Sequence, residues 1–428
     1  MIGADNSRIE IFRRFKKAIR GSSEYMIVGI DIAKDKHHAF FGTANGKSIL
    51  RRIVFDNNIQ GFEKLTNRVK LEMTQNGLSK VVFGLEPTAN YGKPLAEHLI
   101  KCAKLVVLTS GEAIATNRKS LDGRWDSNDT KDSANVADLV SQAKCQFYEY
   151  PLMPIRELRN LLSWKRRLKK QEHGLKVRIR NHLIAQYFPE LDRHFGAGGQ
   201  EILNIIKWCL SPNQISGMEF DKFLQIVAPR ERGLRQRERL KDIWELALHS
   251  IGCDAGQALD FEASMMVENL LRARKDIKAV SEKITHICGS FPEYQYLLTI
   301  PGFGPDISSK VLAAIGNPSR FDNTRQLLKM AGFDLNAKRS GKTSDSAVPR
   351  ISKKGKAWLR FALYQAAVVA TSFNKHFIVY FTKQLKGREK ERGIKTKKRV
   401  KLASKMLVIA WTLMKKEEPF NPMYLYMK

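Results

Sequence analysis

Four acidic residues in the first third of the chain have the types and spacing of ligands for divalent metal ions. Asp31 follows the apolar, β-forming run MIVGI, and Glu86 follows the similar run KVVFGL. Asp129 and Asp132 are three residues apart, so both side chains can face the same way from the first turn of a helix. Carboxylates crowded together raise one another's pKa unless cations are present. A pair of divalent metals bridged by such carboxylates can hold a phosphate between them.

Each of these residues also has a purely structural interpretation. Asp31 could begin a turn, and Asp129 with Asp132 could provide an N-cap and a favourable charge in the first helical turn. Substitute ligands also lie nearby in the sequence: Asp35, Asp126 and Asp138. Because magnesium prefers an all-oxygen set of ligands, we predict a two-metal Mg²⁺ site, with Mn²⁺ as the alternative ion.

The segments around the acidic residues alternate between strand and helix patterns from Tyr25 to about Lys144. Apolar β-forming runs predict strands at Met26–Ile32, His38–Thr43, Ser48–Phe55, Lys80–Leu85 and Lys104–Leu108. Helical spacing predicts helices at Gln60–Thr74, Tyr91–Cys102 and Lys131–Lys144. A three-stranded meander followed by alternating helices and strands is typical of a ribonuclease-H-like (RuvC-like) α/β domain. In that fold the ends of the first and fourth strands meet the last helix, which would bring the four carboxylates together.

Pro151 and Pro154 mark a domain boundary, after which a long basic helix begins at Arg156. Leu161, Leu168 and Leu175 recur every seven residues, which is coiled-coil spacing. Cations cover the other faces of this helix, and they form either a solvated surface or a phosphate-binding one; we include among the nucleic-acid-binding candidates Lys165, Arg166, Arg167, Lys169 and Lys170. A second long helix, roughly Glu262–Cys288, could pair antiparallel with the first. The middle of the chain is then a helical stalk whose tip is the helical segment from about Gln200 to Gly256.

The last domain begins near Tyr296 with the spacing of a helix-hairpin-helix motif. Gly302 and Gly304 lie in the turn before a helix at Asp306–Ile315, where glycines can expose backbone N–H groups to a phosphate, although a tight turn between packed helices explains them too. A polar basic loop comes next, ahead of apolar helices at Ala357–Thr371 and Leu402–Met414. Its candidate phosphate-binding residues are Arg339, Lys342, Arg350, Lys353 and Lys354.

Composition identifies the class of partner. Lys and Arg number 74 against 43 Asp and Glu, so the 428-residue chain has a formal net charge of +31. Such a charge favours a polyanion, with nucleic acid before an anionic membrane. No apolar run of about 18 residues predicts a membrane span, and the N-terminal segment has the pattern of a short amphipathic basic helix. The five cysteines are scattered without a CxxC pair, which argues against structural zinc or a disulfide framework and suits a reducing cytoplasm.

Three groups of motifs together resemble the DEDD transposases of the insertion-sequence 110 family. GIDIAKDK, GLEPTANY and DTKDSANVADLV resemble the three acidic motifs of that family. IPGFGPDISSKVLAAIG, RFDNTRQLLKMAGF, RSGK and RISKKGKAWLRFAL resemble its C-terminal transposase domain. The order in which these motifs occur makes the resemblance specific, since none of them alone would be.

The resemblance implies a role for each motif. Asp31, Glu86, Asp129 and Asp132 would bind the metals, and Ser340 would be the nucleophile. The enzyme would exchange DNA strands through a 5′-phosphoserine intermediate, with donor and target DNA paired to a guide-like bridge RNA. It would work as a homo-oligomer, a dimer or tetramer, in which the acidic domain of one subunit meets the serine domain of another. Many relatives carry two serines before the glycine, whereas Arg339 precedes a single serine here, and two rival serines come after it: Ser344 and Ser346.

We therefore expect four segments: a basic extension at 1–24, a ribonuclease-H-like catalytic domain at 25–150, a coiled-coil stalk at 151–295 and a transposase domain at 296–428. The predicted function is an RNA-guided DNA recombinase of the cytoplasm, associated with the nucleoid and not with a membrane. Two alternatives stay open. One is a two-metal nuclease for DNA junctions that forms no serine adduct, and the other is a non-catalytic nucleic-acid-binding protein.

Overall fold

The computed structural model describes residues 8–122, 129–196, 199–208, 210–230, 233–254, 256–336 and 349–426, with only the backbone at residues 8, 121–122 and 129–130. The chain forms two compact units. The first consists of Met1–Leu152 and Ser319–Gln326, and the second of Met153–Pro318 and Leu327–Lys428. Among the described residues, no helix is long and apolar enough to cross a membrane.

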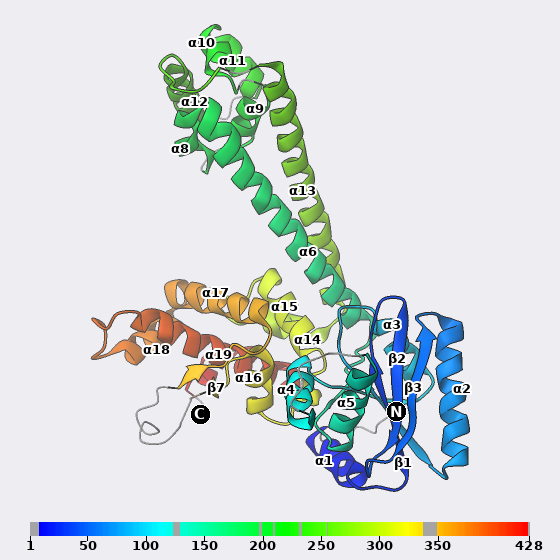
Figure 1. Cartoon of the computed structure of the whole chain (residues 1–428). Coiled ribbons are helices and arrows are strands. Elements are labelled where there is room, and N and C mark those ends of the chain that lie inside the picture. Colours follow the sequence, from blue (N-terminus) through cyan, green and yellow to red (C-terminus); the bar gives the residue numbers. More distant parts are fainter. Residues whose placement is uncertain are drawn as a thin grey trace. The chain divides into compact units, whose positions relative to one another are not determined.

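The first unit is a mixed α/β domain built on a six-stranded sheet (Figure 1). Its elements are α1 (Arg8–Ile19), β1 (Tyr25–Asp31), β2 (Lys36–Thr43), β3 (Ser48–Asp56), α2 (Ile59–Gln75), β4 (Lys80–Leu85), α3 (Lys93–Lys101), β5 (Leu105–Leu108), α4 (Gly111–Asp122), α5 (Asp129–Ser141) and β6 (Gln146–Phe147). The strand order is β3-β2-β1-β4-β5-β6; β1, β4 and β5 are parallel, and β2, β3 and β6 pair antiparallel. The five predicted strands and three predicted helices are present within two or three residues of their expected ends, whereas α4 and β6 were not predicted.

Alternating side chains of the strands build a core on each face of the sheet. Met26, Val28 and Ile30 of β1 pack with the apolar sides of α2 and α3. Ile27 of β1 packs on the opposite face with α1 and α5. Helix α1, which lies within the predicted N-terminal extension, packs on this unit, because Phe12 lies edge-on against Phe147 of β6 at 5.6 Å between ring centroids.

Helix α5 crosses the sheet at two glycines. A Cβ atom placed on Gly29 would lie 2.1 Å from the Ser133 carbonyl oxygen, and one on Gly84 would lie 2.7 Å from Val140 Cγ2. Any larger residue at Gly29 would push the helix backbone away from the sheet. These glycines thus fix where the first turn of α5 lies relative to the ends of β1 and β4.

A short segment from much later in the chain completes this unit. Arg320 forms an ion pair with Glu149, and the Asp322 carboxylate accepts a hydrogen bond from the Ile9 backbone N–H at 3.2 Å. The contacts join residues 171 and 313 positions apart. The helical segments between Leu152 and Ser319 are therefore inserted into the sequence of the α/β domain.

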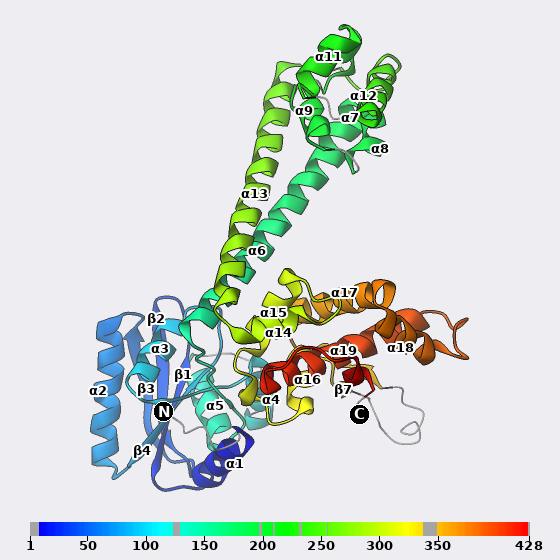
Figure 2. The same ribbon diagram turned by 180° about the vertical axis from the view of Figure 1, so that it is seen from behind.

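The second unit contains two long helices, α6 (Met153–Arg178) and α13 (Gln257–Gly289), which run side by side in opposite directions in both views (Figures 1 and 2). The predicted antiparallel pairing is thus present; its coiled-coil geometry stays a prediction. Helix α6 passes into a π-helical turn, η1 (Ile179–Ile184), whose Ile179, Leu183 and Ile184 are fully buried. Such a turn adds a residue to the helix and rotates the side chains beyond it about the helix axis.

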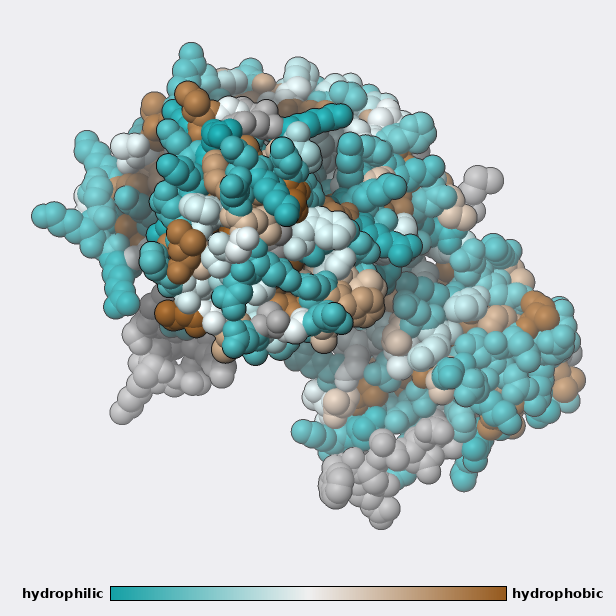
Figure 3. Space-filling model, turned by 90° about the horizontal axis from the view of Figure 1, so that it is seen from above, coloured by the Kyte–Doolittle hydropathy of each residue, from teal (hydrophilic) through white to brown (hydrophobic). Residues whose placement is uncertain are grey.

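The distal end of the helical pair has a core of its own. Its elements are α7 (Ala185–Tyr187), α8 (Asp192–Phe195), α9 (Gln200–Trp208), α10 (Pro212–Ser216), α11 (Phe220–Val227) and α12 (Leu234–Ala247). The last four confirm the predicted helical segment from about Gln200 to Gly256, and α7 and α8 precede it. Phe188 and Phe223 are fully buried in this core. Hydrophilic side chains cover most of the visible surface of this tip, and the hydrophobic ones form small separate patches (Figure 3).

The C-terminal part is mostly helical. It contains α14 (Pro292–Leu298), α15 (Pro305–Ile315), α16 (Thr324–Ala331), a two-stranded ribbon of β7 (Leu335–Asn336) and β8 (Arg350–Ile351), α17 (Ala357–Phe373), α18 (Lys375–Leu385) and α19 (Ile394–Lys416). Helix α17 packs against α15, α18 and α19. Helix α19 begins eight residues before the predicted Leu402, since the basic segment IKTKKRVK that precedes Leu402 is helical as well.

Candidate active site and basic surfaces

Asp31 and Glu86 end adjacent parallel strands. Ile30 of β1 is paired in register with Leu85 of β4, so the next residue of each strand lies at the same edge of the sheet. Both side chains are half-buried. The sequence predicted that the first and fourth strands each end in a carboxylate, and the structure places Asp31 and Glu86 side by side.

Asp132 reaches the same edge from α5. Its neighbour Ser133 lies over Gly29, two residues before Asp31, so the close helix–sheet contact carries Asp132 toward the strand ends. Burial raises the pKa of the Glu86 carboxyl above its usual value, and the negative charges of Asp31 and Asp132 raise it further. We call the three residues Asp31, Glu86 and Asp132 the acidic site.

Arg118 of α4 is a member of this site that the sequence did not reveal. It forms an ion pair with Asp132 and lowers the pKa of Glu86, against the effect of the acids. Helix α4 is held beside α5 because Asn117 donates hydrogen bonds to Asn135 and Asp138, both at 2.7 Å. The helix-forming composition of the stretch EAIATNRKSLD is the sequence signal from which α4 could have been predicted. Its apolar stripe, however, is weak.

Several predicted members of the site are placed differently or lie outside the described residues. The side chain of Asp129 and all of Asp126 are outside them, as is the loop that contains Arg339, Ser340, Lys342, Ser344 and Ser346. Of the substitute ligands, Asp35 is exposed on the turn after β1. Asp138 accepts hydrogen bonds from Asn117 and Gln142, which gives it a structural partner on α4.

The donor set of the acidic site fits a hard divalent cation, because three carboxylates supply oxygen ligands only. Burial and then the negative charges of Asp31 and Asp132 raise the pKa of Glu86, and a cation bound here would offset both effects. Within the described part of the chain, no three His, Cys, Asp or Glu side chains are close enough together to hold a metal as they stand. Arg118 instead supplies the positive charge at Asp132.

The segment that contains Ser340 lies in the sequence between strands β7 and β8. Leu335 pairs with Ile351 and Asn336 with Arg350 in the β7–β8 ribbon. Next to the ribbon, the Ser352 hydroxyl donates to the Asp334 carboxylate at 2.5 Å. The ribbon therefore holds Asn336 next to Arg350, and three of the predicted phosphate-binding cations are exposed on it or just after it: Arg350, Lys353 and Lys354.

The predicted cations of α6 fall into two groups. Arg166, Arg167, Lys169 and Lys170 are exposed, as expected for a phosphate-binding surface. Lys165 is only 12% exposed and its ammonium group lies 2.8 Å from the Asp306 carboxylate of α15, so it joins two helices of the unit. The partner of Lys165 lies 141 residues away in the sequence, and a role of these five cations in binding nucleic acid stays a prediction.

The two turn glycines of the predicted hairpin differ in role. Gly302 has a φ of +87°, and a Cβ there would lie 2.4 Å from the Ala366 carbonyl oxygen of α17. This position requires glycine for packing and for its backbone conformation. Gly304 is exposed with open space around it and precedes α15. Of the two, only Gly304 is exposed, and the helix-hairpin-helix assignment stays a prediction.

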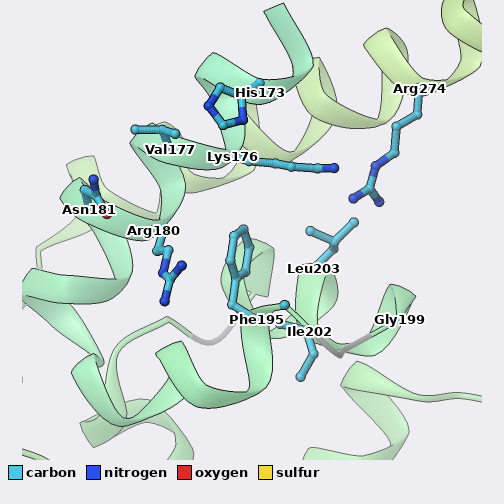
Figure 4. Close-up of a pocket in the computed structure, with 11 residues that line it drawn as sticks. His173, Lys176, Val177, Arg180, Asn181, Phe195, Gly199, Ile202, Leu203 and Arg274 are labelled. Carbon is cyan, nitrogen blue, oxygen red and sulfur yellow. The ribbon is translucent and has the colours of Figure 1, made fainter. Parts of the chain in front are cut away.

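A pocket of about 410 Å³ lies near the end of α6, between α6, α9 and α13 (Figure 4). Lys176, Arg180 and Arg274 line it, and they surround Phe195 in the close-up. Their charges are already engaged, since Lys176 and Arg274 pair with Glu172 at 2.7 and 3.5 Å, and Arg180 pairs with Asp192. The site is consequently a weak candidate for a phosphate.

Comparison with known proteins finds matches in both units. A sequence model described as a transposase, for the DEDD proteins of IS110, matches residues 28–189, and one described as "Transposase IS116/IS110/IS902 family" matches residues 294–382. An uncharacterised 43.6 kDa protein of insertion element IS110 from Streptomyces coelicolor is 21% identical over 364 residues, covering 84% of this chain and 87% of that protein. The pilin gene-inverting proteins of Moraxella lacunata and Moraxella bovis are each 30% identical over 160 residues, covering 36% of this chain and 48% of theirs. The matched regions contain the acidic site and the segment around the β7–β8 ribbon, and this chain belongs to the IS110 family of transposases.

Proposed function

We propose that this transposase cuts and rejoins DNA through a covalent bond between Ser340 and a 5′-phosphate, with a divalent metal at the acidic site. The observation that carries the proposal is the convergence of Asp31, Glu86 and Asp132 at one edge of the sheet, where burial and then the charges of the two aspartates raise the pKa of Glu86. The strand order and the position of α5 support a ribonuclease-H-like domain. Two relatives are named for inverting a pilin gene, which is a DNA rearrangement.

The acidic site would hold Mg²⁺ or Mn²⁺ through Asp31, Glu86 and Asp132, with Asp129 as a fourth ligand. Bound there, a divalent ion would polarise a phosphodiester and assist deprotonation of a hydroxyl. Arg118, which forms an ion pair with Asp132 in the described chain, would hold that carboxylate in position until the ion binds. Because burial and the neighbouring carboxylates raise the pKa of Glu86, a bound cation would favour its ionised form.

In the first step the Ser340 Oγ attacks a backbone phosphorus. The Oγ–P bond forms, the P–O3′ bond breaks, and the departing strand end takes up a proton as a 3′-hydroxyl. In the second step a 3′-hydroxyl from another strand attacks the phosphoserine, which restores the serine. One phosphodiester is exchanged for another, so the reaction needs no ATP. The exposed cations beside the ribbon, Arg350 and Lys353, would bind the flanking phosphates.

Two further parts of the proposal come from the family resemblance and the charge. A bridge RNA would pair with donor and target DNA, and the net charge of +31 suits a protein that binds several polyanions. A homo-oligomer would bring the acidic site of one subunit to the serine loop of another. Both parts can be tested by purifying the protein and determining the bound RNA and the mass of the complex.

The central test uses the purified full chain, Mg²⁺ and a branched DNA junction labelled at one end. We expect a covalent protein–DNA adduct on a denaturing gel that Ser340→Ala abolishes. Ser344→Ala and Ser346→Ala are the matched controls and should retain the adduct. Cleavage without an adduct that persists in Ser340→Ala would support the junction nuclease instead. DNA binding without scission, unchanged in Asp31→Ala, would leave only a binding protein.

A further inference from the structure

A second pocket in the helical unit has a different character from the one near the end of α6. It encloses about 540 Å³ between α6, α15 and α17. Six cations and one carboxylate line it, together with the aromatic rings of Trp358 and Phe361. We call it the α6–α17 pocket. A volume of this size is typical of sites for small molecules or single residues of a polymer.

The cations of the pocket divide into structural and available ones. Lys165 and Lys310 both bind the Asp306 carboxylate, at 2.8 and 2.5 Å. Burial raises the pKa of Asp306, but these two ammonium groups outweigh it and lower the pKa to about 2. The Asp306 carboxylate therefore stays ionised, and the two lysines balance its charge. It does not repel an incoming anion strongly.

Arg166 and Lys169 supply the available charge. Both are exposed on α6 and line the pocket, and neither takes part in an ion pair within the described residues. They are three positions apart, so they lie on the same face of the helix. In contrast to the cations of the pocket in Figure 4, they have no carboxylate partner in the part of the chain that the structure describes.

The aromatic side chains are the second observation. Phe361 is 62% exposed although it lines a cavity, and Trp358 is half-buried with the Lys356 ammonium group 5.8 Å from its ring centroid. A large exposed phenylalanine among cations has no role in the core of the unit. Aromatic faces beside cations are typical of surfaces on which unpaired bases stack, while the phosphates bind Lys and Arg.

We propose that the α6–α17 pocket binds an unpaired nucleotide, whose base stacks on Phe361 and Trp358 and whose phosphates contact Arg166 and Lys169. A base-paired duplex does not meet these requirements, since its base faces are covered by neighbouring bases. The inference rests on the proposed function only in that nucleic acid is the partner. The strand can be DNA or RNA, because both have the same phosphates and the same base faces.

Equilibrium binding of fluorescent single strands to the full chain, without divalent metal, tests the pocket apart from catalysis. We compare Phe361→Ala with Phe373→Ala, because both phenylalanines are exposed on α17 and only Phe361 lines the pocket. Phe361→Ala removes the ring on which one base would stack, so it should weaken binding about tenfold. Phe373→Ala should bind as the unaltered chain does. A strand with abasic sites should bind Phe361→Ala and the unaltered chain equally.

The charge is tested with two double variants on the same helix. Arg166→Ala with Lys169→Ala removes the lining pair, and Arg167→Ala with Lys170→Ala removes an equally charged, exposed pair outside the pocket. Without the lining pair, the slope of log affinity against log salt should fall by about 0.7 for each phosphate that the variant no longer binds, and the affinity should fall further than without the other pair. The same measurements with a DNA strand and with an RNA strand of equal sequence show which of the two the pocket prefers. Equal reductions from the two pairs, or an unchanged affinity in Phe361→Ala, would overturn the proposal, and a failure of the Ser340 adduct assay would not affect it.

Discussion

The acidic site and the α6–α17 pocket are assembled in opposite ways. The acidic site takes Asp31 from β1, Glu86 from just after β4 and Asp132 from α5, and the fold brings these like charges together. The available charge of the pocket comes mostly from Arg166 and Lys169, which lie on neighbouring turns of one helix. The helix alone brings these two side chains close together. The first arrangement depends on tertiary structure and the second mainly on helical periodicity. Disturbing the fold should therefore damage them unequally.

The largest effect is expected at the acidic site. Asp31→Asn removes a ligand of the proposed metal, which should slow strand cleavage by about a thousandfold or more, since a bound metal contributes several kcal/mol. The measurement is the rate of junction cleavage under saturating Mg²⁺, with circular dichroism to verify the fold. Asp35→Asn is the matched control, because Asp35 is exposed on the turn after β1. An equally severe reduction in Asp35→Asn would reassign the ligand.

The close contact between α5 and Gly29 of the sheet should be the feature next most sensitive to mutation. Gly29→Ala places a Cβ 2.1 Å from the Ser133 oxygen, and we expect it to reduce the free energy of unfolding of the α/β unit by about 1–3 kcal/mol. Gly174→Ala is a matched substitution in α6 with nothing within 4 Å of the new atom. It should increase the free energy of unfolding by up to about 1 kcal/mol. Urea unfolding measured by circular dichroism reports on both. Equal and small changes would mean that α5 does not depend on this contact.

The sequence predicted the sheet well because its signals are local. Runs such as MIVGI and KVVFGL predict strands directly, and Asp31 and Glu86 end them as expected. Arg118 was missed, since its helix has a weak apolar stripe and its partner Asp132 lies 14 residues on in a different element. The ion pair of Lys165 with Asp306 was missed for a similar reason, because it is formed only by the packing of α6 on α15.

Arg118 gives a smaller test of the acidic site. Arg118→Met removes the partner of Asp132 and the charge that lowers the pKa of Glu86, so that pKa should rise further. We expect cleavage to fall about tenfold, the order of a missing hydrogen bond to a charged group. The acidic limb of the rate profile should also move to higher pH. Lys119→Met, an exposed neighbour on α4, should change neither quantity.

The smallest expected effect is an acid sensitivity of the helical unit. The pKa of Asp306 is about 2 in the folded chain against an ordinary 3.8, so its contribution to stability is present above about pH 3.8 and is lost as the pH falls toward 2. Because the side chain is 39% exposed, we expect a contribution of less than about 1 kcal/mol. Asp306→Asn should flatten the dependence of the unfolding midpoint on pH in that window. Asp221→Asn, at a side chain that is 78% exposed, should leave the slope intact.

The return of residues 319–326 to the α/β unit has a consequence for how the protein is made. A ribosome synthesises the strands and α5 first, and then needs about ten to thirty seconds to produce the 166 residues from Met153 to Pro318. During that time Glu149 and the Ile9 backbone lack Arg320 and Asp322. The α/β unit can thus collapse early but reaches its final set of contacts only after the whole helical insertion has left the ribosome.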